Sequence, residues 1–127
     1  MIALHHVQVA CPPGGEDAAR RFYGEGLGLA EVDKPANLAG RGGAWFRAFD
    51  ETGAVTAELH VGVEDPFVPA RKAHPALLLP SMELLEEVAG RLGRLGYVVD
   101  RSEWSTFAGY HRVHVADGHG NRVELLA

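Results

Sequence analysis

The chain contains 127 residues and carries a formal net charge of −5 at pH 7. That length supports one domain, or two half-size modules that share a core, and is too short for two independent domains. The acidic balance provides no positive field for a polyanion, so a nucleic-acid partner is not expected. The single cysteine, Cys11, excludes an internal disulfide framework. No segment resembles a signal peptide or a membrane span, so we expect a cytoplasmic protein with no membrane partner.

The first half of the chain predicts a strand, a helix and two more strands. Residues 3–11 have a strand-like pattern that ends at two prolines and two glycines, which neither a strand nor a helix interior tolerates. Residues 16–23 begin with acidic side chains and space their apolar residues for a short helix. Strands are expected over 44–49 and 55–63, separated by the turn at 50–53.

The second half of the chain repeats this order of elements. A strand is expected over 74–79, followed by a helix that Ser81 caps and Gly96 ends. Further strands are predicted over residues 97–99, 110–115 and 122–126. The repeated order indicates an internal duplication, with a first module over residues 1–65 and a second over 72–127.

Potential metal ligands fall on one face of three predicted strands. Alternate residues of a strand share a face, so His6 lies opposite the apolar side chains of its strand. Glu58 and His60 share a face of the strand over 55–63. Near the end of the chain, Glu124 lies opposite its apolar neighbours. Each of these strands therefore presents one packing face and one face with a candidate ligand.

The two halves supply matching ligands. His6 matches His74 and Glu58 matches Glu124 at nearly the same offset along the chain, 68 and 66 residues. Two such halves that face each other would form a His–Glu–His–Glu set. His60 shares the face of Glu58 and is the alternative ligand at that position, or a residue beside the ion. The matched offsets favour Glu58 but do not exclude His60.

The ligand types restrict the metal only to a group of divalent ions. Imidazole and carboxylate suit zinc or nickel, our first choices, and also iron(II), manganese or cobalt. Water at the remaining positions would make the ion a Lewis acid that stabilises an enediolate or alkoxide. The remaining histidines are expected to be structural or at the surface, with His5 on the packing side of its strand: His5, His111, His114 and His119.

Five segments of the chain carry recognisable motifs. They are Leu-His-His-Val-Gln-Val at 4–9, Arg-Phe-Tyr-Gly-Glu-Gly-Leu-Gly-Leu at 21–29, Ala-Glu-Leu-His-Val at 57–61, Ala-His-Pro-Ala-Leu at 73–77 and Gly-Asn-Arg-Val-Glu-Leu at 120–125. With these segments the chain resembles the glyoxalase, bleomycin-resistance and dioxygenase group over nearly its whole length. Phe-Tyr followed by Leu-Gly-Leu, together with the terminal Gly-Asn-x-x-Glu-Leu, is specific for that fold and not for one reaction.

The resemblance implies an α+β fold of two βαβββ modules, whose curved mixed sheets surround a metal-binding cavity. It also implies a homodimer, although it does not say whether modules pair within or between chains. Bacterial glyoxalase I carries ligands in the order His, Glu, His, Glu, which matches His6, Glu58, His74 and Glu124. Extradiol dioxygenases and fosfomycin-modifying enzymes use a His, His, Glu set, which His6, His74 and Glu124 would satisfy. Drug-sequestering members generally lack the metal set.

We therefore expect a metal-dependent lyase or isomerase of the glyoxalase I kind that acts on a small oxygenated substrate or its thiol adduct. Glu58 or Glu124 would leave the ion and act as the general base. The alternatives are an iron(II) extradiol dioxygenase and a non-enzymatic protein that sequesters a drug or other ligand, as bleomycin-resistance proteins do. Candidate substrate-binding side chains, for which ordinary packing is an equally good explanation, are Trp45, Phe46, Phe107, Tyr110 and Arg112.

Overall fold

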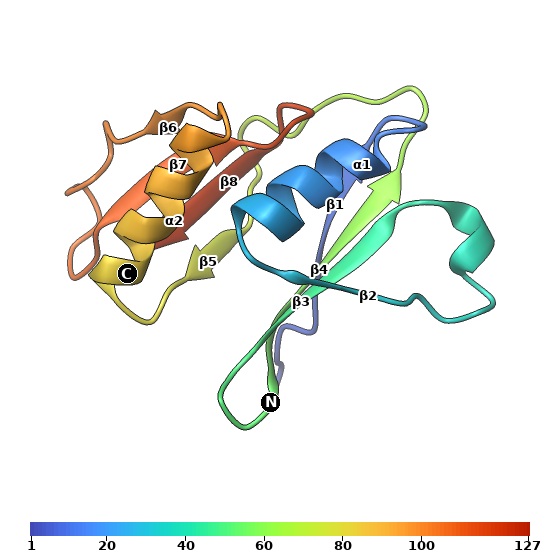
Figure 1. Cartoon of the computed structure of the whole chain (residues 1–127), viewed down its shortest axis with the longest axis horizontal. Coiled ribbons are helices and arrows are strands. Elements are labelled where there is room, and N and C mark those ends of the chain that lie inside the picture. Colours follow the sequence, from blue (N-terminus) through green and yellow to red (C-terminus); the bar gives the residue numbers. More distant parts are fainter.

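Two four-stranded mixed sheets make up the protein, seen here in a computed structural model that describes residues 1–127 (Figure 1). In each sheet, the strand that comes first in the sequence lies at one edge and pairs in parallel with the strand that comes last. The other neighbouring strands are antiparallel. The first sheet has the order β1 (Val7–Cys11), β4 (Val55–Val63), β3 (Ala44–Phe49), β2 (Ala30–Val32). The second has the order β5 (Ala76–Leu78), β8 (Arg122–Leu126), β7 (Arg112–Ala116), β6 (Val99–Asp100).

The first helical segment packs on the first sheet and begins as α1 (Glu16–Ala19), which continues into a π-helical turn, η1 (Arg20–Gly26). Phe22 and Tyr23 of this segment are fully buried. Gly26 lies against the second helix, where an added Cβ would meet Leu92 Cδ2 at 2.7 Å. This close approach explains why residue 26 is a glycine.

The second helix, α2 (Met82–Arg94), packs on the second sheet as its apolar pattern predicts (Figure 1). Ser81 caps it, with Oγ accepting a hydrogen bond from the Leu84 amide at 3.2 Å. Its buried stripe consists of Leu85, Val88, Ala89 and Leu92. Neither this helix nor any other has the length and apolar character needed to span a membrane.

One hydrophobic core joins the two halves of the chain. Polar contacts between the halves reinforce it. The Tyr23 hydroxyl donates to Asp117 Oδ2 at 2.6 Å, and Asn121 Nδ2 donates to the Ala10 carbonyl at 2.7 Å. Asn121 is the asparagine of the terminal Gly-Asn segment, so that segment ties the second sheet to β1 of the first.

Several strand ends differ from the sequence prediction. β1 begins at Val7 and not at residue 3, so His5 and His6 precede it. The prediction that His5 faces the packing side is wrong because His5 lies outside the strand and is exposed. β5 begins at Ala76, which leaves His74 two residues ahead of it. Two short elements were not predicted at all: β2, and the 3₁₀ turn η2 (Ala39–Arg41).

Candidate functional site

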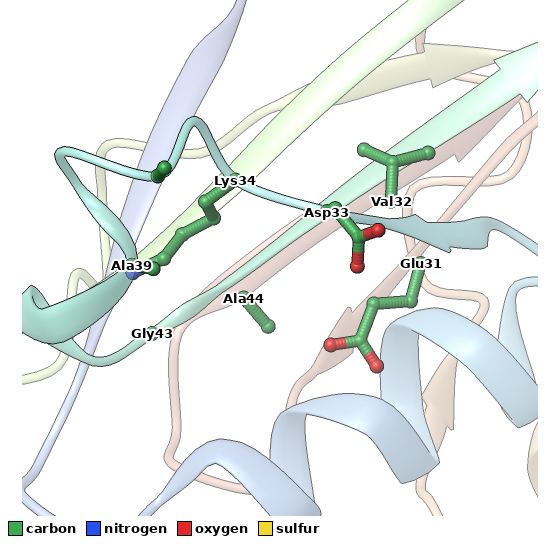
Figure 2. A pocket seen from close by; sticks show the side chains of 8 residues that line it. Glu31, Val32, Asp33, Lys34, Ala39, Gly43 and Ala44 are labelled. Atoms are coloured by element: carbon green, nitrogen blue, oxygen red, sulfur yellow. The ribbon is translucent and has the colours of Figure 1, made fainter.

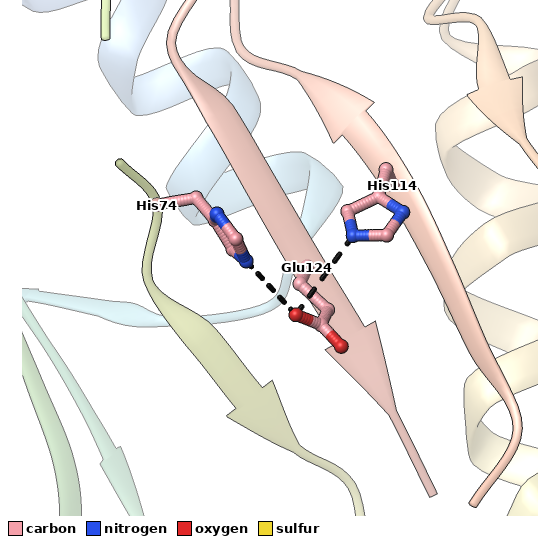
Figure 3. A group of neighbouring side chains, drawn as sticks. All are labelled: His74, His114 and Glu124. Atoms are coloured by element: carbon pink, nitrogen blue, oxygen red, sulfur yellow. Dashed lines mark hydrogen bonds and ion pairs between the residues drawn. The ribbon is translucent and has the colours of Figure 1, made fainter. Parts of the chain in front are cut away.

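Three side chains gather on the polar face of the second sheet, which we call the C-terminal cluster: His74, His114 and Glu124 (Figure 3). One ligand atom from each lies within 4.8 Å of the others. β7 and β8 place His114 directly opposite Glu124 in the antiparallel ladder. Their strand neighbours on the other face, among them Val113 and Leu125, belong to the core. The alternation of the strands therefore delivers the polar side chains to one face.

The two carboxylate oxygens of Glu124 face different groups. Oε2 lies 2.9 Å from His74 Nε2 and 3.8 Å from His114 Nε2. Oε1 accepts a hydrogen bond from Arg112 Nη1 at 3.2 Å. The side chain is only 5% exposed. Burial raises the pKa of Glu124, but the contacts with His74 and Arg112 outweigh it and leave that pKa below its usual value.

The two histidines of the C-terminal cluster have different partners. His74 Nδ1 is 2.8 Å from the Lys72 carbonyl, so Nδ1 is the protonated nitrogen and Nε2 faces the carboxylate. His114 is buried, and neither of its ring nitrogens has a hydrogen-bond partner. Burial, followed by the charge of Arg122, lowers the pKa of His114, so its ring is neutral at pH 7.

A second set of side chains, the N-terminal cluster, lies on the polar face of the first sheet and consists of His6, Trp45, Arg47, Glu58 and His60. The His60 ring is stacked between two others. Its centroid is 3.8 Å from that of Trp45 with an interplanar angle of 1°, and 4.1 Å from that of His6 with an angle of 20°. These contacts fix the plane of the His60 ring.

Glu58 is buried beside His60 and Arg47. Its Oε1 lies 3.0 Å from His60 Nε2 and accepts a hydrogen bond from Arg47 Nη2 at 3.3 Å. Its Oε2 is 3.2 Å from Arg47 Nε, at an angle that makes no hydrogen bond. The contact with His60, and then that with Arg47, lowers the pKa of Glu58 against the effect of burial. Glu58 is therefore an ionised carboxylate with one oxygen free of hydrogen bonds.

The two clusters remain separate within one chain. The structure brings His74 and Glu124 together, as the sequence predicts, and adds His114 to them. His6, Glu58 and His60 gather on the other sheet and share no such group with His74 or Glu124. The sequence prediction did not include His114, which was expected to be structural or at the surface. Its place beside Glu124 depends on the register of β7 against β8.

The candidate substrate-binding residues fall into three environments. The prediction that Phe46 binds substrate is wrong, because Phe46 is fully buried in the core. It packs near Tyr23, with ring centroids 5.8 Å apart. Trp45, its strand neighbour, points to the opposite, polar face and stacks on His60. The exposed rings of Phe107 and Tyr110 form an edge-to-face pair at 5.1 Å, with the Arg112 guanidinium 5.5 Å from the Phe107 centroid.

Two of the hollows on the surface lie near the predicted ligands or the loop before β3. One, of about 420 Å³, lies between β2 and the η2 loop and includes Glu31, Asp33 and Lys34, but no residue of either cluster (Figure 2). The other, of about 400 Å³, borders the C-terminal cluster, because His114 lines it together with Arg122.

The chain is similar to a family and to several solved structures. The model of the Glyoxalase/Bleomycin resistance protein/Dioxygenase superfamily matches residues 3–125. A glyoxalase family protein from Bacillus anthracis is 37% identical, with 99% of this chain and 94% of that chain covered and a TM-score of 0.85. Among proteins with curated functions, none matches this sequence.

More distant structures share the fold alone. The fosfomycin resistance protein FosX from Listeria monocytogenes is 15% identical, with a TM-score of 0.72 and coverage of 100% of this chain and 93% of that chain. A glyoxalase/dioxygenase from Nostoc punctiforme is 20% identical, with a TM-score of 0.71 and coverage of 98% and 89%. The family match over nearly the entire sequence settles the classification: the chain belongs to the Glyoxalase/Bleomycin resistance protein/Dioxygenase superfamily.

Proposed function

We propose that the protein is a divalent-metal-dependent lyase or isomerase that acts on a small oxygenated substrate or its thiol adduct. One observation carries the proposal, the contact between His74 Nε2 and Glu124 Oε2 at 2.9 Å. Because Nδ1 is protonated toward the Lys72 carbonyl, two acceptor atoms face each other, and a proton or a metal ion must lie between them. The donor set therefore fits a divalent ion such as zinc or nickel.

The proposed site combines both clusters in a homodimer. His74 and Glu124 would hold the ion, and His6 with Glu58 or His60 would come from the N-terminal cluster. These two groups do not meet within one chain, so the N-terminal cluster of one protomer would face the C-terminal cluster of its partner. Such an arrangement is a symmetric interface of the commonest kind.

The residues of the N-terminal cluster supply proton transfer. When bound, the ion supplies a Lewis acid for the substrate oxygens. Glu58, kept ionised by His60 and Arg47, has Oε2 free of hydrogen bonds and can take a proton from a carbon next to a carbonyl and return it to the adjacent carbon. His60 Nε2 keeps Oε1 in place during this transfer. The exposed Phe107–Tyr110 pair and Arg112 would contact the substrate.

Turnover of thiol adducts of 2-oxoaldehydes by the zinc- or nickel-loaded protein tests this proposal. We expect thioester formation with wild type, and a decrease in kcat of at least about 100-fold for Glu58→Gln with its metal retained. Glu25→Gln, a change at an exposed carboxylate outside both clusters, is the matched control. Loaded wild type that converts no adduct, or full activity of Glu58→Gln, would overturn the proposal.

A second candidate function is iron(II) extradiol dioxygenation. The observation that favours it is the composition of the C-terminal cluster, two histidines and one carboxylate, which is the ligand set of many non-haem iron oxygenases. Anaerobic reconstitution with iron(II), followed by oxygen and a panel of catechols, tests this alternative. Coloured ring-cleavage products would support it, and their absence with iron bound would exclude it.

A further inference from the structure

We infer that Arg71 and Arg122 form a carboxylate-binding subsite in the hollow beside the C-terminal cluster, and that the substrate is a short acid whose carboxylate lies there. The inference rests on the proposed function, because it names the class of substrate that the same site would take. It assigns a role to two arginines and to a hollow of about 400 Å³ that the proposed reaction leaves unused.

The backbone brings Arg71 and Arg122 together, although they are far apart in the sequence. The segment that precedes β5 runs beside the start of β8, where two hydrogen bonds hold Ala70. The Ala70 amide donates to Asn121 Oδ1 at 3.0 Å, and its carbonyl accepts from the Arg122 amide at 2.8 Å. The backbone at Arg71, the next residue, is therefore fixed beside that of Arg122, and both residues line the hollow.

Neither of these two arginine side chains has a partner within the protein. Arg71 and Arg122 form no side-chain hydrogen bond and no ion pair, whereas four other arginines each pair with a carboxylate: Arg20, Arg47, Arg101 and Arg112. The chain as a whole has a net charge of −5, so acidic partners are plentiful elsewhere. Two unpaired guanidinium groups that line one hollow repel each other, and a bound anion would remove that repulsion.

The one acidic side chain that lines the hollow, Asp100, leaves the arginines available. Its Oδ1 accepts a hydrogen bond from the Ser102 amide at 2.8 Å, and it forms no ion pair with either arginine. Hydrogen bonds from Ser102, and then the charge of Arg122 among others, lower the pKa of Asp100, so it is ionised at pH 7. Two guanidinium groups and one carboxylate leave the hollow a net charge of +1. That charge matches a carboxylate better than a phosphate monoester, which carries about −1.5 to −2 at pH 7.

The remaining lining of the hollow suits a short carbon chain. Ala116 and Gly120 are small and leave space in front of the arginines. Val98 is 84% exposed and gives the hollow an apolar wall. A guanidinium group can donate two parallel hydrogen bonds to the two oxygens of a carboxylate. The hollow therefore combines donors for a carboxylate with apolar surface for the methylene groups next to it.

The register of β7 and β8 sets the distance from this subsite to the C-terminal cluster. Ala116 lies opposite Arg122, and His114 lies opposite Glu124. Arg122 and Glu124 share one face of β8 and are two residues apart, which corresponds to about 7 Å along a strand. His114 belongs to the cluster and also lines the hollow. A substrate with its reacting oxygens beside Glu124 would thus reach the arginines through a short chain of atoms.

The hollow between β2 and the η2 loop has no comparable pair of cations (Figure 2). Its single cation, Lys34, donates to the Gly42 carbonyl, and its Glu31 carboxylate is bound to Arg20 at 2.8 Å. Glu31 and Asp33 give that hollow an excess of negative charge. An anionic substrate group is therefore expected only in the hollow beside the C-terminal cluster.

Titration of the metal-free full-length protein with propionate tests the subsite independently of the proposed reaction. Propionamide, which has nearly the same shape and no charge, is the comparison ligand at matched ionic strength. Nitrogen-15 spectra of the arginine side chains report binding. We expect the Nε signals of Arg71 and Arg122 to shift with propionate and not with propionamide. Arg122→Gln and Arg71→Gln should each weaken propionate binding at least about 5-fold, the effect of losing a charged hydrogen bond that water partly screens.

Arg94→Gln is the matched control, because Arg94 is an exposed arginine of α2 that does not line the hollow. It should bind propionate as wild type does. Arg122→Lys keeps the charge but loses the paired N–H groups, and should recover only part of the affinity lost in Arg122→Gln. Near-ultraviolet circular dichroism checks that each variant is folded. Arg71 is exposed, so Arg71→Gln keeps the test available if the Arg122 variants unfold.

Steady-state kinetics of the metal-loaded protein then connect the subsite to the substrate. The two substrates are 2-oxoaldehyde adducts of 3-mercaptopropionate and of its uncharged amide. We expect a KM at least about 5-fold lower for the carboxylate adduct in wild type. Arg122→Gln should abolish this preference by raising KM for that adduct, with kcat within about 2-fold of wild type, because the arginine binds the substrate equally in its ground and transition states.

The outcomes separate the inference from the proposed function. Propionate shifts at Arg71 and Arg122, without turnover of either adduct by the loaded wild type, would support the subsite and refute the proposed reaction. Turnover of both adducts with equal KM, or equal responses to propionate and propionamide, would overturn the inference and leave the proposed reaction standing. A protein that neither binds propionate nor converts an adduct would overturn both.

Discussion

His114 lies directly across the β7–β8 ladder from Glu124, yet its Nε2 is 3.8 Å from the carboxylate and has no hydrogen-bond partner. On the first sheet, the residue opposite Glu58 is Arg47, which does hydrogen-bond to its carboxylate. Both carboxylates accept a hydrogen bond from an arginine, but only Glu124 faces a buried histidine without a partner across the ladder. The proposed function assigns metal binding to Glu124 and proton transfer to Glu58.

Complementation between two inactive variants tests the proposed homodimer. One variant carries His6→Ala and Glu58→Gln, and the other carries His74→Ala and Glu124→Gln. If each site combines clusters from two protomers, an equal mixture that is unfolded and refolded together should regain about one quarter of wild-type activity, because half of the dimers have one intact site. Sites formed within single chains would yield no activity in the mixture.

Substitution of two glycines tests the contact between the helical segments. Gly26→Ala should destabilise the protein by about 1–3 kcal/mol, because its Cβ would meet the buried Leu92 at 2.7 Å. Gly93→Ala, in α2 with no atom within 4 Å of the added Cβ, should instead stabilise it by about 0.5–1 kcal/mol through helix propensity. Urea unfolding measures both. Equal effects of the two changes would contradict the packing described here.

Phe46 and Phe107 should respond differently to truncation. Phe46→Ala removes a ring with no exposed surface and should cost about 3–5 kcal/mol of unfolding free energy. Phe107 is 45% exposed, so Phe107→Ala should change stability by about 0.5 kcal/mol or less and instead raise KM for the substrate. Chemical unfolding and steady-state kinetics give the two readouts. A large loss of stability in Phe107→Ala would show that Phe107 is a packing residue.

The Tyr23–Asp117 hydrogen bond should make stability sensitive to alkaline pH. Burial, followed by the charge of Asp117, raises the pKa of Tyr23 above its ordinary value. Because this pKa is raised in the folded state, the hydrogen bond contributes its full stabilisation of the fold below about pH 10, where an unfolded tyrosine is protonated. Its contribution to stability decreases above that pH. Tyr23→Phe should cost about 1–3 kcal/mol at pH 7. Above pH 10 the thermal midpoint of the variant should fall less steeply than that of wild type, and parallel curves would refute this linkage.

Much of the fold could be predicted from strand alternation and capping residues. The pattern correctly placed Val9, Leu59 and Leu125 in the core, and it identified the Ser81 cap. The ends of strands were less predictable, because pairing partners determine them. β1 begins only at Val7, where β4 supplies a partner at Leu59. The short β2 depends on its pairing with β3 and has no alternating pattern of its own.

The candidate site was predictable in part. His74 and Glu124 follow from the matched offsets, and the structure brings them together. His114 could not be assigned without the register of β7 against β8, which places it opposite Glu124. The sequence prediction assigned both Trp45 and Phe46 to the cavity wall. Adjacent residues of a strand point to opposite faces, so only one of the two could lie there. The division into modules at residues 65 and 72, and the metal ligands themselves, stay predictions.

We propose that this chain binds one divalent ion through His74 and Glu124. Elemental analysis of protein purified without chelator or affinity metal tests this binding, with His74→Ala and Glu124→Gln beside wild type and Glu25→Gln as the control. We predict about one ion per chain in wild type and in the control, in keeping with a single ligand set, and none in the two cluster variants. Wild-type protein that contains no metal, and takes up none from zinc, nickel, iron(II) or manganese, would contradict metal binding by this chain.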